Sequence, residues 1–178
     1  IISPKIGIER FYHTENEQEI LENLINLSKP NREVKTIFVW PEGVFNSTEL
    51  KNIKKYQNIF KEKFSNKHLI VFGINNSVNE KTFNSLAVVN NNLDLIEFYN
   101  KNNLVPFGEF LPLENILKNI GLRVITNNYQ SFSKGEKREI IEINRKDLSL
   151  KILPLICYEI IYSGKLFIKQ NFDLIINI

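Results

Sequence analysis

The chain has 178 residues, with 23 basic and 20 acidic side chains and a formal net charge of +3. Its composition, 43% hydrophobic and 24% charged, is that of an ordinary globular protein, and we expect one domain over residues 1–178. The scattered basic residues argue against a nucleic-acid-binding surface, and the single cysteine excludes an internal disulfide and a CxxC metal or redox site.

The first third of the chain predicts a helix, a buried strand and a second helix. Thr14 and Glu17 have the spacing of a capping box, and apolar residues then recur at helical spacing over residues 20–27. The β-rich run over residues 34–40 predicts a strand, which Pro-Glu-Gly breaks. An apolar stripe over residues 49–64 predicts the second helix.

The middle of the chain predicts three strands and a loop. The apolar run over residues 68–74 predicts a buried strand. Residues 82–89 and 93–99 flank Asn-Asn-Asn, which is typical of a hairpin. Residues 101–112 contain two prolines and a glycine, so we expect a loop there.

The last third of the chain predicts a second group of strands. The apolar run that ends at Ile156 predicts a buried strand that presents Cys157 at its carboxyl end. No apolar run reaches the roughly 18 residues of a membrane-spanning helix. We expect a mixed α/β layered domain, completed by a helix over 113–120, a loop over 127–135, a strand pair over 138–143 and 148–156, a helix over 160–169 and a strand over 172–178.

Three strand ends carry residues suited to nucleophilic catalysis. A cysteine thiol must lose its proton to react, and the only two histidines, His13 and His68, both fit structural or surface positions better than a catalytic one. Glu42 follows the strand over residues 34–40 and is the other candidate base. Lys101 follows a third strand and would lower the pKa of the Cys157 thiol or stabilise an oxyanion.

Each of these residues also has an ordinary structural interpretation. A lone cysteine after an apolar strand is most often a small core residue, a glutamate after a strand is often a turn residue, and a lone lysine is usually on the surface. The conjunction of three such strand ends favours a catalytic site.

Three segments of the chain resemble the carbon–nitrogen hydrolase (nitrilase) superfamily, in the same order. They are the Val-Trp-Pro-Glu segment that ends at Glu42, the run from Lys101 to Glu109, and Ile-Cys-Tyr-Glu at residues 156–159. The Leu-Val-Pro-Phe-Gly-Glu and Cys-Tyr-Glu motifs, with Ser-Phe-Ser-Lys-Gly at residues 131–135, are similar more narrowly to apolipoprotein N-acyltransferases.

The resemblance implies an α/β fold, a nitrilase-like α-β-β-α sandwich that is incomplete at both ends of this chain. It implies that the general base is Glu42, the oxyanion stabiliser Lys101 and the nucleophile Cys157. It also implies supporting roles for Glu109, which would orient Lys101, and for Tyr158 and Glu159, which would shape the pocket behind the nucleophile.

The implied reaction is a ping-pong acyl transfer without cofactor or metal. Cys157 would accept an acyl chain from a phospholipid and pass it to the α-amino group of a diacylglyceryl-modified lipoprotein cysteine. The implied location is the bacterial inner membrane, with this domain on the periplasmic face and with membrane helices that the chain does not contain.

Two other interpretations remain open at this stage. One is a soluble carbon–nitrogen hydrolase that uses water in place of the amine, and the other is an inactive remnant of a split gene. Because sheet edges would be exposed, we expect the 178 residues alone to be destabilised and inactive. The loop over residues 107–135 either forms a lid against lipid or packs on the domain.

Overall fold

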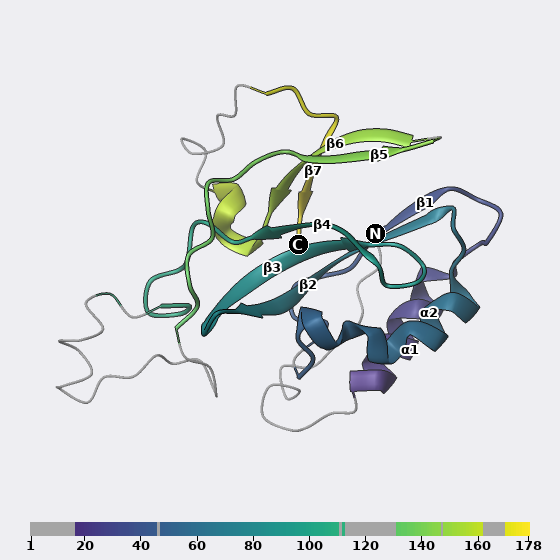
Figure 1. The fold of residues 1–178 in the computed structure, drawn as a ribbon, viewed down its shortest axis with the longest axis horizontal. Coiled ribbons are helices and arrows are strands. Elements are labelled where there is room, and N and C mark those ends of the chain that lie inside the picture. Colours follow the sequence, from purple (N-terminus) through teal and green to yellow (C-terminus); the bar gives the residue numbers. More distant parts are fainter. Residues whose placement is uncertain (1–16, 46, 111, 113–130, 147, 162–169) are drawn as a thin grey trace.

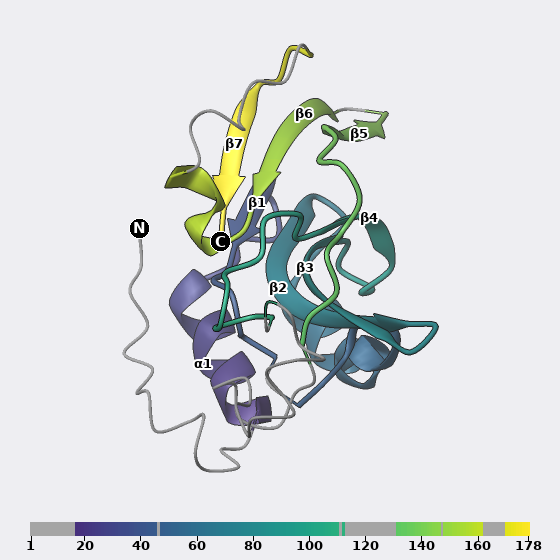
Figure 2. The ribbon, with the colours of Figure 1, turned by 90° about the vertical axis from the view of Figure 1, so that its left-hand side faces the viewer.

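The computed structural model describes residues 17–45, 47–110, 112, 131–146, 148–161 and 170–178. Within them, two β-sheets face each other, and helices cover the far face of the larger sheet (Figures 1 and 2). No helix in this described part of the chain is long and apolar enough to cross a membrane.

The larger sheet contains the first four strands in the order β1-β2-β3-β4, with β1 parallel to β2 and the other pairs antiparallel. The predicted hairpin between β3 and β4 is confirmed, and the side chain of Asn90 shapes its turn by accepting hydrogen bonds from the backbone N–H groups of Asn92 (2.8 Å) and Asp94 (2.9 Å). The strands are β1 (Thr36–Val39), β2 (His68–Val78), β3 (Lys81–Val89) and β4 (Leu95–Asn100).

The smaller sheet has the order β5-β6-β7, with β5 antiparallel to β6 and β6 parallel to β7. Its strands are β5 (Ile141–Arg145), β6 (Leu148–Leu155) and β7 (Leu174–Asn177). The first strand of the pair begins and ends later than expected, because Asn144 and Arg145 pair with Ser149 and Leu148 instead of forming the turn.

The predicted second helix is two helices of different kinds. A 3-10 helix, η2 (Leu50–Tyr56), leads into α2 (Gln57–Lys63). The buried residues of η2, Ile53 and Tyr56, are three positions apart, which matches the three-residue turn of a 3-10 helix. A second 3-10 helix, η3 (Cys157–Ile161), follows β6.

Helix α1 (Glu17–Ser28) is confirmed, although Thr14 of the expected capping box lies outside the described residues. Glu17 is buried and accepts hydrogen bonds from Thr48 N (3.1 Å), Thr48 Oγ1 and Tyr56 Oη (2.7 Å). The start of α1 is thereby tied to the segment that leads from β1 into η2.

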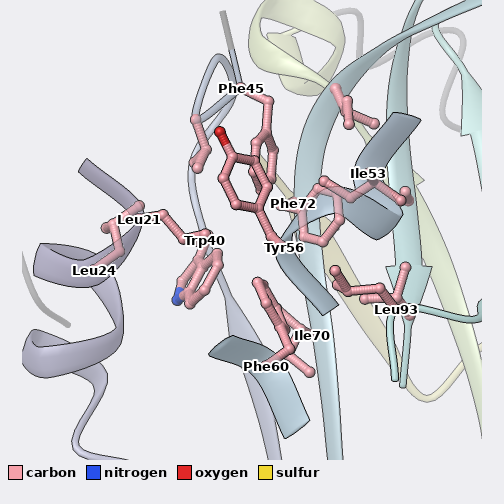
Figure 3. Packing of buried hydrophobic residues seen from close by; sticks show 14 of the residues in the cluster. Leu21, Leu24, Trp40, Phe45, Ile53, Tyr56, Phe60, Ile70, Phe72 and Leu93 are labelled. Atoms are coloured by element: carbon pink, nitrogen blue, oxygen red, sulfur yellow. The ribbon is translucent and has the colours of Figure 1, made fainter. Parts of the chain in front are cut away.

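The central strands of the larger sheet, β2 and β3, are buried on both faces over most of their length. Alternate residues of β2 point to opposite sides: Phe72 packs with Trp40 and Phe60 beneath the helices (Figure 3), and Val71 packs against the smaller sheet. A strand buried on both faces needs apolar residues at successive positions, which explains the unbroken apolar run in β2.

Three layers of the expected sandwich are therefore described: helices, the larger sheet and the smaller sheet (Figure 2). The helices predicted over residues 113–120 and 160–169 fall mostly on positions outside the described residues.

Candidate active site

Glu42 lies just beyond β1, in a turn held close to β2. Trp40 N continues the β1–β2 ladder by donating to Val71 O (2.8 Å), and Gly43 takes a positive φ of 69° that lets the chain turn away. A Cβ on Gly73 would lie 2.8 Å from the Cα of Glu42, so only glycine lets the turn approach β2 this closely.

Lys101 lies directly after β4 and is 1% exposed. Its Nζ forms an ion pair with Glu109 Oε1 at 2.8 Å, and Glu109 Oε2 accepts a hydrogen bond from Val105 N (2.9 Å). Its backbone N–H donates to Asn84 O (2.8 Å), and its carbonyl accepts from Gly135 N (2.9 Å). Lys101 is thus held through both its main chain and its side chain. The alternative interpretation of Lys101 as a surface residue is wrong.

Cys157 lies at the sharp turn between β6 and η3. Its φ is +53°, which is uncommon for a residue with a side chain. Its N–H donates to Ile178 O (2.6 Å), and Ile178 N donates back to Leu155 O (3.2 Å). The end of β7 therefore holds the turn that presents the half-buried thiol.

The surroundings of Cys157 bring the three strand ends together. Burial raises the pKa of its thiol, and the charge of Glu42 raises it further, as does a hydrogen bond between the Glu42 carboxylate and the thiol. The charge of Lys101 and the backbone N–H of Tyr158 act in the opposite direction, and the net shift is upward. The thiol is therefore protonated at neutral pH, with a carboxylate in place to receive its proton.

The supporting residues lie in different surroundings. Glu109 contacts Lys101, as expected, while the side chain of Tyr158 is 56% exposed. Glu159 is completely buried, with Oε1 accepting from Tyr99 Oη (2.8 Å) and Asn103 N (2.9 Å).

The Glu159 carboxylate also joins the strand ends that carry Cys157 and Lys101. Its Oε2 accepts from Ile156 N (3.0 Å), next to Cys157, and its Oε1 also accepts from Asn102 N (3.2 Å), next to Lys101. Arg138 pairs with Glu159 at 2.8 Å. Burial raises the pKa of Tyr99 well above its usual value, and the charge of Glu159 and the hydrogen bond to it raise that pKa further.

His68 lies at the start of β2 and not at one of these strand ends. His68 is fully buried, with Nδ1 accepting from Ser65 N (3.2 Å) and Nε2 2.9 Å from Asn31 O. It has the structural position that the sequence predicted, and His13 lies outside the described residues.

Two residues around the site were not singled out from the sequence. Asn84 on β3 donates from one nitrogen to Glu42 Oε1 (2.5 Å) and to Glu109 Oε1 (2.9 Å). Arg138 lies in a run of mostly charged residues (134–139) of a composition that is typical of an exposed segment. The sequence of β3 does not mark Asn84 as special, because polar residues are common in strands. Its role depends on Glu42 and Glu109, which come from distant parts of the chain.

Comparison with known proteins gives matches along the whole chain, although no protein-family model matches. An apolipoprotein N-acyltransferase from Wigglesworthia glossinidia brevipalpis is 28% identical over 188 residues, covering 100% of this chain and 36% of that protein. One from Rickettsia prowazekii is 31% identical over 175 residues, covering 92% of this chain and 33% of that protein. The chain spans about a third of the length of these curated relatives.

The fold is similar to that of solved amidases. A mutant of the Nesterenkonia AN1 amidase from the nitrilase superfamily matches with a TM-score of 0.52 and 11% identity, over 84% of this chain and 53% of that one. This likeness confirms the expected α/β fold. The chain is therefore similar, along nearly its whole length, to about a third of the length of apolipoprotein N-acyltransferases, and it has the fold of the nitrilase superfamily.

Proposed function

We propose that residues 1–178 belong to the catalytic domain of an apolipoprotein N-acyltransferase. The observation that carries the proposal is the thiol of Cys157 beside the carboxylate of Glu42 and the ammonium of Lys101, each from a different strand end. In this proposal Cys157 is the nucleophile, Glu42 the general base and Lys101 the oxyanion stabiliser.

The first half-reaction loads the enzyme. Glu42 takes the proton from the Cys157 thiol as sulfur attacks the ester carbonyl of a phospholipid, and the negative oxygen that forms is stabilised by Lys101. When the tetrahedral intermediate collapses, the carbon–oxygen ester bond breaks and Glu42 returns the proton to the departing lysophospholipid oxygen. The product is an acyl thioester on Cys157.

The second half-reaction unloads it. The neutral α-amino group of a diacylglyceryl-modified lipoprotein cysteine attacks the thioester carbonyl, and Glu42 takes one of its protons. As the tetrahedral intermediate collapses, the carbon–sulfur bond breaks, Glu42 returns the proton to the sulfur of Cys157, and the products are the N-acyl amide and the free thiol. Splitting the transfer in two allows both steps to use the same base and the same oxyanion stabiliser. A mutant of the amidase from Nesterenkonia sp. AN1, which has a similar fold, carries acrylamide added to its active-site cysteine. That adduct supports a nucleophilic role for Cys157.

The substrates and the location follow from the relatives. We propose a phospholipid as donor, a diacylglyceryl-modified apolipoprotein as acceptor, and the periplasmic face of the bacterial inner membrane as the place of action. Phe107, 54% exposed, offers apolar surface beside the site, but the loop is held to the domain by a hydrogen bond from Ser133 N to Thr82 O on β3 (2.7 Å) and by the ion pair of Glu109 with Lys101 (2.8 Å). The described part of the loop thus favours a packed segment over a freely moving lid.

The second candidate is hydrolysis of the acyl-enzyme by water, as in a carbon–nitrogen hydrolase. It is favoured by the amidase fold of the structural neighbours. The two functions differ only in the acceptor, so one experiment separates them.

Because residues 1–178 alone are expected to be inactive, the test uses the whole protein that contains them. It is incubated with phospholipid vesicles and a synthetic diacylglyceryl-cysteine peptide, and the lipid and peptide products are analysed by mass spectrometry. The proposal predicts a peptide heavier by one acyl chain, lost in Cys157→Ala. Free fatty acid without acylated peptide would instead establish the hydrolase. Products that persist in Cys157→Ala would exclude both.

A further inference from the structure

Asn84 lies on β3 between two carboxylates and is 6% exposed. Its Nδ2 donates to Glu42 Oε1 at 2.5 Å and to Glu109 Oε1 at 2.9 Å. The same Glu109 oxygen is 2.8 Å from Lys101 Nζ. A single amide nitrogen therefore joins the proposed base to the carboxylate that holds the proposed oxyanion stabiliser.

We propose that Asn84 is a positioning residue that fixes the orientation of the Glu42 carboxylate beside the Cys157 thiol. The inference rests on the proposed function for the role of Glu42 as base. The placement of the amide itself depends only on the hydrogen bonds.

The chemistry of the position selects an amide. An NH₂ group has two hydrogens, one for each carboxylate, whereas a serine hydroxyl has one and an aspartate has none. An aspartate would also add a third negative charge. Because both neighbours accept hydrogen bonds only, the nitrogen of Asn84, and not its oxygen, must face them.

The backbone of Asn84 contacts Lys101, the positively charged residue of the site. Asn84 O accepts the N–H of Lys101 (2.8 Å), where β4 leaves the sheet. Asn84 therefore helps to position Glu42 through its side chain and Lys101 through its main chain.

The ionisable groups around Glu42 determine the sign of the expected effect. They are the Cys157 thiol and Lys101, from the ends of β6 and β4, and Glu109, which shares the Asn84 amide. Without the amide, Glu42 loses a hydrogen bond to its charged form and faces Glu109 with no donor between them. Both changes favour protonation, so the pKa of Glu42 must rise.

The direct test is a ¹³C NMR titration of the protein labelled at glutamate Cδ, with the Glu42 signal assigned by its loss in Glu42→Gln. Asn84→Ala is expected to raise the pKa of Glu42 by about one unit, as for the loss of one hydrogen bond to a charged group. The isosteric Asn84→Asp is expected to raise it further, and Asn84→Ser, which keeps one donor, to raise it less.

A buried amide elsewhere provides the matched control. Asn76 on β2 is 8% exposed, and its Nδ2 reaches Asn100 Oδ1 at 3.5 Å. Asn76→Ala removes an equally buried amide and is expected to leave the Glu42 titration unchanged.

A second measurement separates this inference from the proposed function. The rate of Cys157 acylation by a p-nitrophenyl ester is followed against pH, and in Asn84→Ala its acidic limb is expected to move upward with the Glu42 titration. An unchanged Glu42 titration in folded Asn84→Ala and Asn84→Asp would overturn the inference, whatever the activity. A shifted titration in a protein whose Cys157 is never acylated would support the role of Asn84 and overturn the proposed function.

Discussion

Replacing Glu159 by glutamine tests the buried hydrogen-bond network that joins the strand ends carrying Cys157 and Lys101. Glutamine has the same shape but no charge, and one of its ends carries hydrogens. If its oxygen replaces Oε1, the new NH₂ group meets the N–H of Ile156, and one hydrogen bond is lost. If it is turned around, the bonds from Tyr99, Asn102 and Asn103 are lost instead.

The charge effect is larger than either loss. Arg138 has a side chain only 6% exposed and would lose its buried ion pair with Glu159. Breaking one partner of a buried ion pair typically costs about 3–5 kcal/mol, so we expect Glu159→Gln to lower the free energy of unfolding by about that amount. Urea denaturation at pH 7 measures it, with the midpoint falling and the slope unchanged.

Two further variants make the measurement specific. Glu139→Gln removes an exposed carboxylate one residue from Arg138 and is expected to change stability by less than about 0.5 kcal/mol. Adding Arg138→Met to Glu159→Gln removes the buried guanidinium that paired with Glu159, so the double variant should recover part of the loss. A loss below about 1 kcal/mol in Glu159→Gln, equal to that of Glu139→Gln, would refute the argument, because a buried ion pair cannot be that cheap to break.

Three other predictions concern the site and the core beneath it. Gly73→Ala places a methyl group against the backbone of Glu42, so we expect Cys157 acylation to slow at least about tenfold while far-UV circular dichroism stays native; an unchanged rate would mean that the turn has room to move. Because only the thiolate reacts with iodoacetamide and the pKa of Cys157 is raised, its alkylation should rise with pH above the range of a free cysteine; Glu42→Gln should move this profile to lower pH and Lys101→Met to higher pH, and shifts of the opposite sign would contradict the assigned charges. Trp40→Phe removes a buried indole N–H that donates to a hydroxyl on α1 (2.9 Å) and should cost about 1–3 kcal/mol in thermal or urea unfolding, whereas a neutral change would show that the hydrogen bond and the lost volume are compensated.

The sequence predicted the features that local patterns determine. The strand patterns that end at Trp40, Tyr99 and Ile156 are signals confined to a few residues, and the polar residues that follow them mark where each strand ends. That these ends meet was inferred from their conjunction and from the resemblance.

The parts that depended on long-range contacts could not be predicted. Asn84 resembles any polar residue in a strand until the sheet order β1-β2-β3-β4 is known and the fold brings Glu42, which follows β1, to its side chain. Arg138 lies in a charged stretch, and only the fold buries it against Glu159. The division of residues 49–64 into η2 and α2 also escaped prediction, because spacings of three and four both fit an amphipathic helix.

The most direct measurement of the central claim is intact-protein mass spectrometry after incubation with phospholipid vesicles, followed by peptide mapping. We predict one acyl adduct per chain, located on Cys157, released by neutral hydroxylamine as a thioester, and absent from Cys157→Ala. An adduct that persists in Cys157→Ala, or that maps to another residue, would contradict the account.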